Sequence, residues 1–246
     1  MMESLRAELH VHTLLSPCAE VEMIPPLIVQ EALERRIGLI AITDHNASAN
    51  VEAVQRAAAG TGLTVLPGME LQTQEEVHLL CLFDSIEQLF AWQAVVDGCL
   101  PDQENIPEFF GEQFIVDETG DFIRRENRLL LTSASLSLEA ACRGVSELEG
   151  LAIPAHVDRK AFGLIANLGF IPDKLPIEAL EISRRHTPQQ ARQAFPQVGS
   201  YPLVRSGDAH RLVEFLGANR FYIQNPSIAE IRRAFRSEGG RRLIVE

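Results

Sequence analysis

Histidine residues stand in this chain at positions where short apolar segments end. There are seven of them: His10, His12, His45, His78, His156, His186 and His210. His10 and His12 are two residues apart, so in an extended segment both imidazoles project to the same side and can reach one metal ion. Asp208 and His210 repeat this spacing with a carboxylate in the first position. Paired donors of this kind predict a metal site.

Further donors follow other apolar segments, and together with the two pairs they form a larger set. Any single histidine is commonly structural, and one pair two residues apart arises by chance in many proteins. The joint placement of six histidines and two carboxylates at segment ends favours metal ligands instead. His186 lies in a polar turn and is left out of the set. The candidate ligands are therefore His10, His12, His45, Glu70, His78, His156, Asp208 and His210.

The donor types indicate which metals and which reaction to expect. A mixture of nitrogen and oxygen donors suits Zn, Mn or Fe, whereas Ca and Mg prefer oxygen. The set is too large for one ion, so we expect two or three divalent transition-metal ions. Such clusters clamp the attacking and leaving oxygens of a phosphoryl displacement, which predicts hydrolysis. The chain carries no GxSxG, GxxxxGK[ST] or helix-opening GxGxxG motif that would indicate a competing chemistry.

The elements that must position these donors alternate along the chain. Continuous apolar runs without polar alternation, such as 39–42, are typical of strands buried on both faces. Repeated strand-then-helix units favour a parallel sheet, and about seven such units favour a closed (β/α) barrel, whose C-terminal strand ends would gather the donors. We expect strands at 6–12, 39–42, 63–66, 76–83, 151–154, 179–183, 203–206, 220–224 and 242–245, and helices at 25–36, 48–59, 86–96, 137–149, 159–167, 188–195 and 227–237.

One stretch departs from this alternation. Residues 98–131 are rich in Pro, Gly, Asp, Glu and Phe and predict an excursion from the barrel, with a short hairpin around 119–121. The length of 246 residues suits one α/β barrel or two small domains, and a hydrophobic content of 46% allows a substantial core. We expect a single barrel domain over 1–246.

Charge and hydropathy narrow the partners. The formal net charge is −12, whereas proteins that grip nucleic-acid backbones usually present a basic surface, so we expect no long nucleic acid as partner. A small phosphorylated substrate is compatible, because bound cations reverse the field locally. The N-terminal residues lack the apolar stretch of a secretion signal and no long apolar run follows, so a cytoplasmic protein without membrane contact is expected. The sequence does not indicate an oligomeric state.

The segments that carry the donors resemble the four motif blocks of the PHP (polymerase and histidinol phosphatase) family. They read AELHVHT at 7–13, ITDHN at 42–46, PGME at 67–70 with EVHLL at 76–80, AH at 155–156 and SGDAH at 206–210. The resemblance spans the chain from the first strand to residue 210, leaving 98–131 unmatched. It implies a distorted seven-stranded (β/α)7 TIM-like barrel with a trinuclear metal centre at the C-terminal ends of the strands.

The resemblance also implies how the ligands divide. His10, His12, Glu70 and Asp208 would hold the first metal, and Glu70 would bridge to a second that His78 and His156 complete. His45 and His210 would serve the third, joined by a residue from the loop after the first motif. Glu70, Asp208 and His210 are the residues we expect to carry catalysis.

The loop that should complete the third site departs from the family pattern. Cys18 stands where the family usually has Asp, so its thiolate is a candidate ligand; a packing role for Cys18, or a ligand role for Glu20 instead, remains open. Asp44 would either orient a ligand or cap a helix.

Cationic residues near the expected strand ends are candidates for the substrate phosphate. Arg159, Arg184 and Arg185 are the ones we expect to bind it, since a guanidinium matches a phosphate in bidentate fashion. The function this supports is hydrolysis of a small phosphorylated metabolite or nucleotide. A nuclease acting on short oligonucleotides, and a non-catalytic metal-stabilised binding module, are the alternatives.

The ligand count predicts the metal content directly. Protein purified without chelator should hold at least two transition-metal ions per chain, because eight convergent nitrogen and oxygen donors exceed what one ion accepts. Elemental analysis of the purified protein measures this. Fewer than one ion per chain, without gain on reconstitution, would contradict a multinuclear site.

Overall fold

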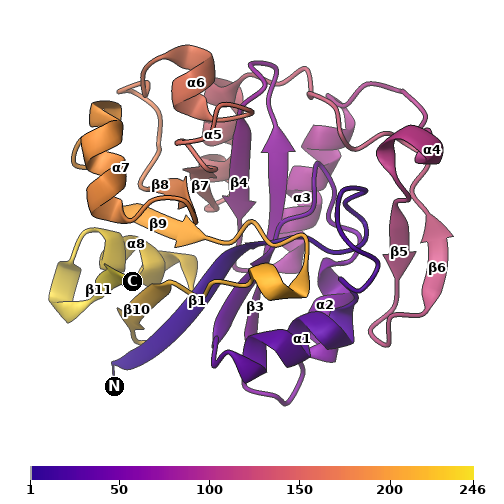
Figure 1. Ribbon diagram of the computed structural model, residues 1–246, viewed down its shortest axis with the longest axis horizontal. Coiled ribbons are helices and arrows are strands. Elements are labelled where there is room, and N and C mark those ends of the chain that lie inside the picture. The colour runs from indigo at the N-terminus through magenta and orange to yellow at the C-terminus, as the bar shows by residue number, and fades with distance from the viewer. Residues whose placement is uncertain (1) are drawn as a thin grey trace.

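A curled seven-stranded mixed sheet forms the centre of the computed structural model, which describes residues 2–246 (Figure 1). The sheet order is β11-β10-β1-β2-β3-β4-β7. The strands β1, β2 and β3 run parallel, whereas the other neighbouring pairs run antiparallel. The strand bounds are β1 (Glu3–Val11), β2 (Leu39–Ile42), β3 (Thr64–Gln72), β4 (His78–Leu82), β7 (Leu151–Pro154), β10 (Asn219–Ile223) and β11 (Arg242–Val245).

Two further parallel strands, β8 (Leu180–Ser183) and β9 (Leu203–Ser206), form a separate small sheet. Backbone hydrogen bonds tie it to both sides of the large sheet. Val157 N donates to Glu181 O at 2.9 Å beyond β7, and His12 N donates to Ala209 O at 3.0 Å beyond β1. These contacts draw the ends of β7, β8, β9 and β1 toward one another, so the donors they carry can share one site.

The α/β class is confirmed, but the regular succession of seven parallel β/α units is not observed. The departure begins after β3, where residues 73–77 turn the chain straight back into the antiparallel β4. A parallel crossover needs a dozen or more residues, and this short connection therefore permits only a hairpin. Most predicted strands and helices are found within a few residues of their expected positions, but the strand expected at 63–66 continues to Gln72 and the helix expected at 159–167 begins only at Leu164.

Eight α-helices flank the sheets within residues 2–246, and their ends follow local rules. A capping box joins Ser85 and Gln88 at the start of α3, and a second joins Thr187 and Gln190 at the start of α7. These helices are too short or too polar to cross a lipid bilayer. Their bounds are α1 (Pro25–Glu34), α2 (Val51–Ala57), α3 (Ile86–Asp97), α4 (Pro107–Phe110), α5 (Leu138–Glu147), α6 (Leu164–Leu168), α7 (Pro188–Ala194) and α8 (Ile228–Phe235).

The core lies on both faces of the large sheet. In β2, Ile40 and Ile42 join one buried cluster while Leu39 and Ala41 join the other. The continuous apolar run of this strand is therefore explained by burial on both sides. A charged side chain inside such a strand is buried, so it must pair with another polar group. The polar residues of the site described below are paired in this way.

The excursion at 98–131 contains the expected hairpin. Its strands are β5 (Phe114–Val116) and β6 (Phe122–Arg125), at the far right of Figure 1. Asn50 holds the hairpin to the rest of the fold, because its side chain accepts from Val116 N and donates to Phe114 O, each at 3.0 Å.

Gly207 provides a test of how the fold places the loop after β9. A Cβ at this position would clash with the carbonyl oxygen of Glu214, and Gly207 N donates to the buried Glu8 carboxylate at 3.0 Å. We expect Gly207→Ala to lower the free energy of unfolding by about 1–3 kcal/mol, the usual cost of overpacking. Thermal and denaturant unfolding measure this.

The matched control is Gly98→Ala, where φ is −71° and a Cβ meets nothing closer than 3.5 Å. This variant should keep the wild-type stability. Equal stability of both variants would show that the loop after β9 adapts freely.

Candidate metal centre

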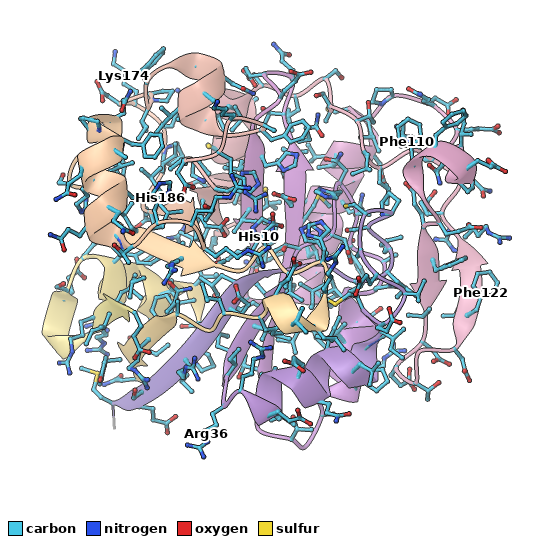
Figure 2. All side chains as sticks on the ribbon, in the orientation of Figure 1. His10, Arg36, Phe110, Phe122, Lys174 and His186 are labelled. Carbon is cyan, nitrogen blue, oxygen red and sulfur yellow. The ribbon has the colours of Figure 1, made fainter. Side chains whose placement is uncertain are left out.

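The structure brings all eight candidate ligands to one edge of the sheet, in the region of His10 at the centre of Figure 2. His10 lies in β1, Glu70 in β3 and His78 in β4, while the others follow β1, β2, β7 and β9. His78 differs from expectation, since it is the first residue of its strand and not near the end. Because β4 runs antiparallel to β3, its beginning lies at the same edge as the ends of β1, β2 and β3.

Seven of the eight residues form three overlapping groups of donor atoms within residues 2–246, and His156 adjoins them through Glu70. In each group, atoms from every member lie within 4.8 Å of one another. The groups share members, so one ion's ligands adjoin the next. They consist of His10, His12, Glu70 and Asp208; of His45, Glu70 and His78; and of His12, His45 and His210.

The first group has the spacing of a metal coordination shell. From His10 Nε2 the distances are 3.0 Å to His12 Nε2, 3.1 Å to Asp208 Oδ1 and 3.2 Å to Glu70 Oε1. An ion bound at about 2.0–2.1 Å by four or six donors holds neighbouring donors about 2.9–3.4 Å apart. The four residues therefore fit a transition-metal ion.

Hydrogen bonding on the far side of the His10 and His12 imidazoles turns their Nε2 lone pairs inward. His10 Nδ1 faces the Glu181 carboxylate at 3.0 Å, so it carries the proton. Ser16 Oγ donates to Asp44 at 2.7 Å and can therefore only accept from His12 Nδ1, 2.9 Å away. This assignment follows from the network of partners. Two nitrogen lone pairs 3.0 Å apart repel each other unless a positive charge lies between them.

The electrostatics confirm that the cluster attracts positive charge. Burial lowers the pKa of His10, but the negative charges of Glu181, Glu70 and Asp208 raise it well above its ordinary value. Burial also opposes protonation of His12, yet hydrogen bonds to Asp208 and Glu70 raise its pKa to about 9. Protons and metal ions thus compete for the same nitrogen atoms.

The imidazoles of His45 and His210, which lie outside the first group, can coordinate a metal ion without losing a proton. Burial is the main cause that lowers the pKa of His45 to about 4 and that of His210 to about 3. Both are neutral near pH 7, and a neutral imidazole is the form that binds a metal.

Four buried polar atoms in the cluster make no well-aligned hydrogen bond within residues 2–246, although His45 Nδ1 and Glu70 Oε2 lie 2.9 Å apart. They are His45 Nδ1, Glu70 Oε2, His156 Nδ1 and Asp208 Oδ1. Unsatisfied buried polar atoms are rare in folded proteins, because each costs free energy. Their convergence on one spot is a second observation that fits bound metal.

Glu70 stands at the middle of the cluster. Its Oε1 lies 2.8 Å from His78 Nδ1 and 3.2 Å from His156 Nε2, while its Oε2 lies 2.9 Å from His45 Nδ1. Burial alone would raise the pKa of Glu70, but the imidazoles of His78, His10 and His45 hold it well below its usual range. The two oxygens thus face different histidines, as a bridging carboxylate requires.

Three residues that orient the ligands were not identified from the sequence. Glu181 is fully buried and accepts from both His10 Nδ1 and His156 N. Ser16 and Thr13 link the loop after β1 to Asp44, which accepts from the Thr13 amide at 2.7 Å. The available signal was Glu181 itself, a lone charged residue in the middle of a strand that is otherwise apolar.

The loop after β1 does not bring Cys18 into any of the three donor groups. Cys18 is an exposed residue, although desolvation of its thiol and the charges of Glu70 and Asp208 raise its pKa to about 12. Glu20 turns outward and pairs with Arg211 at 2.9 Å. This arrangement therefore gives no support for Cys18 or Glu20 as a metal ligand.

The cationic residues differ in how near they come. Arg159 Nη1 lies 2.6 Å from Asp208 Oδ2, at the edge of the cluster. Arg184 pairs with Glu214 at 3.1 Å, and Glu214 in turn accepts from His210 N. Arg185 is exposed.

His186 stays outside the donor groups, as expected. Its Nδ1 lies 2.6 Å from Asp158 Oδ2, and Asp158 also accepts from Ser183 N and Oγ. Burial would raise the pKa of Asp158, but these hydrogen bonds lower it.

The contact between Glu181 and His10 predicts a change in metal affinity. Glu181→Ala removes the acceptor that fixes the His10 tautomer and leaves the His156 amide unpaired. We expect the affinity for the tightest ion to fall about 10- to 100-fold, as is usual when a ligand loses its orienting partner. Chelator competition measures this.

The matched control is Glu178→Ala, which removes a carboxylate from the same region that pairs with Arg232 and Arg236 on the surface. This variant should keep its metal. If both variants bind metal equally well, Glu181 does not orient the ligands.

The chain is similar to known proteins in sequence and in fold. Over 80 residues the chain is 34% identical to the 5'-3' exoribonuclease Rnm of Salmonella typhimurium, a match that covers 30% of this chain and 26% of that protein. The fold is similar to a lesion-specific endonuclease from Pyrococcus furiosus, with a TM-score of 0.77, 19% identity, and coverage of 98% of this chain and 58% of that one. The chain thus spans little more than half of this structural neighbour and a smaller part of the exoribonuclease.

The expectation that excluded long nucleic acid is wrong. The same fold occurs in Endonuclease Q solved with a 27-mer duplex substrate (TM-score 0.67, 18% identity, coverage of 98% and 58%), and the sequence relative above is an exoribonuclease. The net charge is a sum over the whole chain and does not describe the local field at a site, which bound cations can reverse. Glu8, Glu70 and Glu181 are fully buried and add nothing to the surface that a ligand meets.

The family assignment rests on a match to a family model. Residues 8–159, more than half of the chain, match the model of the PHP domain. This range includes the donors from His10 to His156, and the structure adds Asp208 and His210 to the same cluster. The chain therefore belongs to the PHP domain family of metal-dependent phosphoesterases.

Proposed function

We propose that this chain is a metal-dependent hydrolase of phosphate esters with two or three divalent transition-metal ions, Zn, Mn or Fe. The observation that carries the proposal is the donor cluster around Glu70, with its inward-facing lone pairs and buried atoms that make no well-aligned hydrogen bond. The family membership supports the reaction class.

The chain's own residues divide the work. His10, His12, Glu70 and Asp208 would hold one ion, Glu70 with His78 and His156 a second, and His45 with His210 a third. When bound, the ions would activate water and neutralise charge on the phosphoryl oxygens.

Three residues are placed to act during the reaction. Glu70 would fix the spacing of two ions, and Asp208 would hold Arg159 against the first. The side chain of His210 is 20% exposed, more than those of its neighbours in the cluster, so it would act at the open side, where the substrate meets the third ion.

The open side also indicates where the phosphate binds. Arg159 is the only one of the three candidate arginines to contact a proposed metal ligand in residues 2–246, through Asp208. Its guanidinium would bind a phosphate oxygen beside the ions. Arg184 and Arg185 would act farther out. The substrate we favour is a small phosphorylated metabolite or nucleotide.

A nuclease is the second candidate, and one feature favours it. A cavity of about 550 Å³ adjoins Asn46, the residue after His45, and is lined by Ser48, Phe90, Arg124 and Arg128 among others. This volume and the exposed Phe90 ring suit a further nucleotide of a strand, although Arg124 and Arg128 pair with Glu126 and Asp97 of the same cavity. A non-catalytic module is disfavoured, because all eight donors expected at the strand ends meet in one cluster.

The proposal predicts loss of turnover in Glu70→Gln. Protein loaded with Mn or Zn should release phosphate from at least one member of a panel of sugar phosphates, nucleotides and short oligonucleotides. Glu70→Gln should lower kcat more than about 100-fold, beyond the cost of losing an orienting partner. Phosphate release and product chromatography measure this.

Glu139→Gln serves as the control, since Glu139 is an exposed carboxylate on α5 paired with Arg143. It should leave both metal content and turnover unchanged. Near-normal activity of Glu70→Gln, or no hydrolysis of any panel member by fully loaded protein, would overturn the proposal.

A further inference from the structure

The loop after β7 carries an aromatic residue directly against the candidate metal centre. The ring of Phe162 stacks on the imidazole of His78, with centroids 4.4 Å apart and an angle of 6° between the planes. His78 in turn contacts Glu70 at 2.8 Å. Phe162 nevertheless remains 38% exposed, so a substantial part of a large apolar side chain faces solvent beside the centre.

The backbone does not explain why this residue is aromatic. Phe162 has φ +57°, a left-handed conformation that glycine or asparagine adopts more readily. The hydrogen bond from His78 N to Phe162 O, at 3.0 Å, holds the strained residue in place. Strained residues that the surroundings enforce are concentrated at functional sites. The side chain, and not the turn, is therefore the reason for phenylalanine here.

The same short loop also carries the cation nearest the centre. Arg159 lies three residues before Phe162 and contacts Asp208 at 2.6 Å. The loop is closed tightly on itself, because a Cβ at Gly163 would clash with the carbonyl oxygen of Arg159. A rigid loop thus presents a guanidinium and an exposed aromatic ring on either side of one metal cluster.

We propose that Phe162 is a stacking platform for a nucleobase, so that the ester hydrolysed beside it belongs to a nucleotide, either free or at the end of a strand. This inference rests on the proposed function. A nucleotide joins an anionic group to a planar ring through one sugar, which matches Arg159 and the ions on one side and Phe162 on the other. Base stacking on an aromatic side chain is tolerant of sequence, so the base identity would matter little.

The first test separates base recognition from support of His78. The probes are adenosine 5'-monophosphate and ribose 5-phosphate, which share the phosphate ester and differ in the base, together with a 5'-phosphorylated dinucleotide and its counterpart lacking the terminal base. Phe162→Ala should lower kcat/KM about 10- to 100-fold for the probes with a base, through KM. It should change the probes without a base less than about twofold, and metal content should be unchanged.

Phe122→Ala is the matched control, because Phe122 is 58% exposed and lies at the outer right edge of Figure 2, away from His10. It should leave all four probes unaffected. Equal loss for probes with and without a base in Phe162→Ala would show that Phe162 only holds His78, and would overturn the inference.

The second test does not depend on turnover. Phe162→Trp keeps an aromatic ring at the site and introduces a fluorescent reporter, while Trp92, the one native tryptophan, is buried. Adenosine 5'-monophosphate should quench the new fluorescence at concentrations where ribose 5-phosphate does not. Quenching without hydrolysis would refute the proposed function and keep the platform. Equal quenching by both compounds would refute the platform whatever the activity.

Discussion

A fully buried carboxylate surrounded by imidazoles is the constraint on which the rest of this structure depends. Glu70 has no exposed surface, and its oxygens face histidines from several elements of the sheet. A buried charge without compensation costs several kcal/mol, so positive charge must be present in protons or in metal ions. This requirement fixes where the ends of β1, β2 and β7 can lie relative to β3. The need to compensate the Glu70 charge thus accounts both for the convergence of the strands and for the histidines at their ends.

Buried carboxylates outside the donor cluster hold the candidate metal ligands in place. Glu181 fixes the ring of His10, and Asp44 fixes that of His12 through Ser16. Glu8 accepts the amides of Gly207, Leu216 and Gly217, and in this way holds the loop that carries Asp208. Burial raises the pKa of Glu8 to about 7, despite these hydrogen bonds. Part of the acidity of the chain therefore serves internal architecture, so the net charge does not by itself describe the field at the site.

The sequence was informative where a local pattern has one physical cause. The apolar run of β2 behaved as its pattern predicts. The paired donors at His10 and Asp208 do meet in space. The strand expected at 63–66 is too short, because the observed strand continues through Pro67 and Gly68 to Gln72. Gly68 is needed there because a Cβ would collide with Ile42 O in the neighbouring strand.

Other features could not be predicted because they depend on tertiary contacts. The role of Glu181 follows from its contact with His10, which is 171 residues away in the sequence. The reversal of β4 places His78 at the start of its strand and still beside Glu70. The outward turn of Glu20 follows from its pairing with Arg211, which no spacing rule would show.

The division of labour between strands and loops follows from burial. The donors on and just after β1, β3 and β4 are fixed by packing and by the buried carboxylates outside the donor cluster, so they tolerate little change. The residues with solvent access, Arg159, Phe162 and His210, lie on the loops after β7 and β9. These loops therefore border the solvent-facing side of the centre. Changes in the loops can alter which phosphate ester is bound while the reaction itself, set by the strands, is retained.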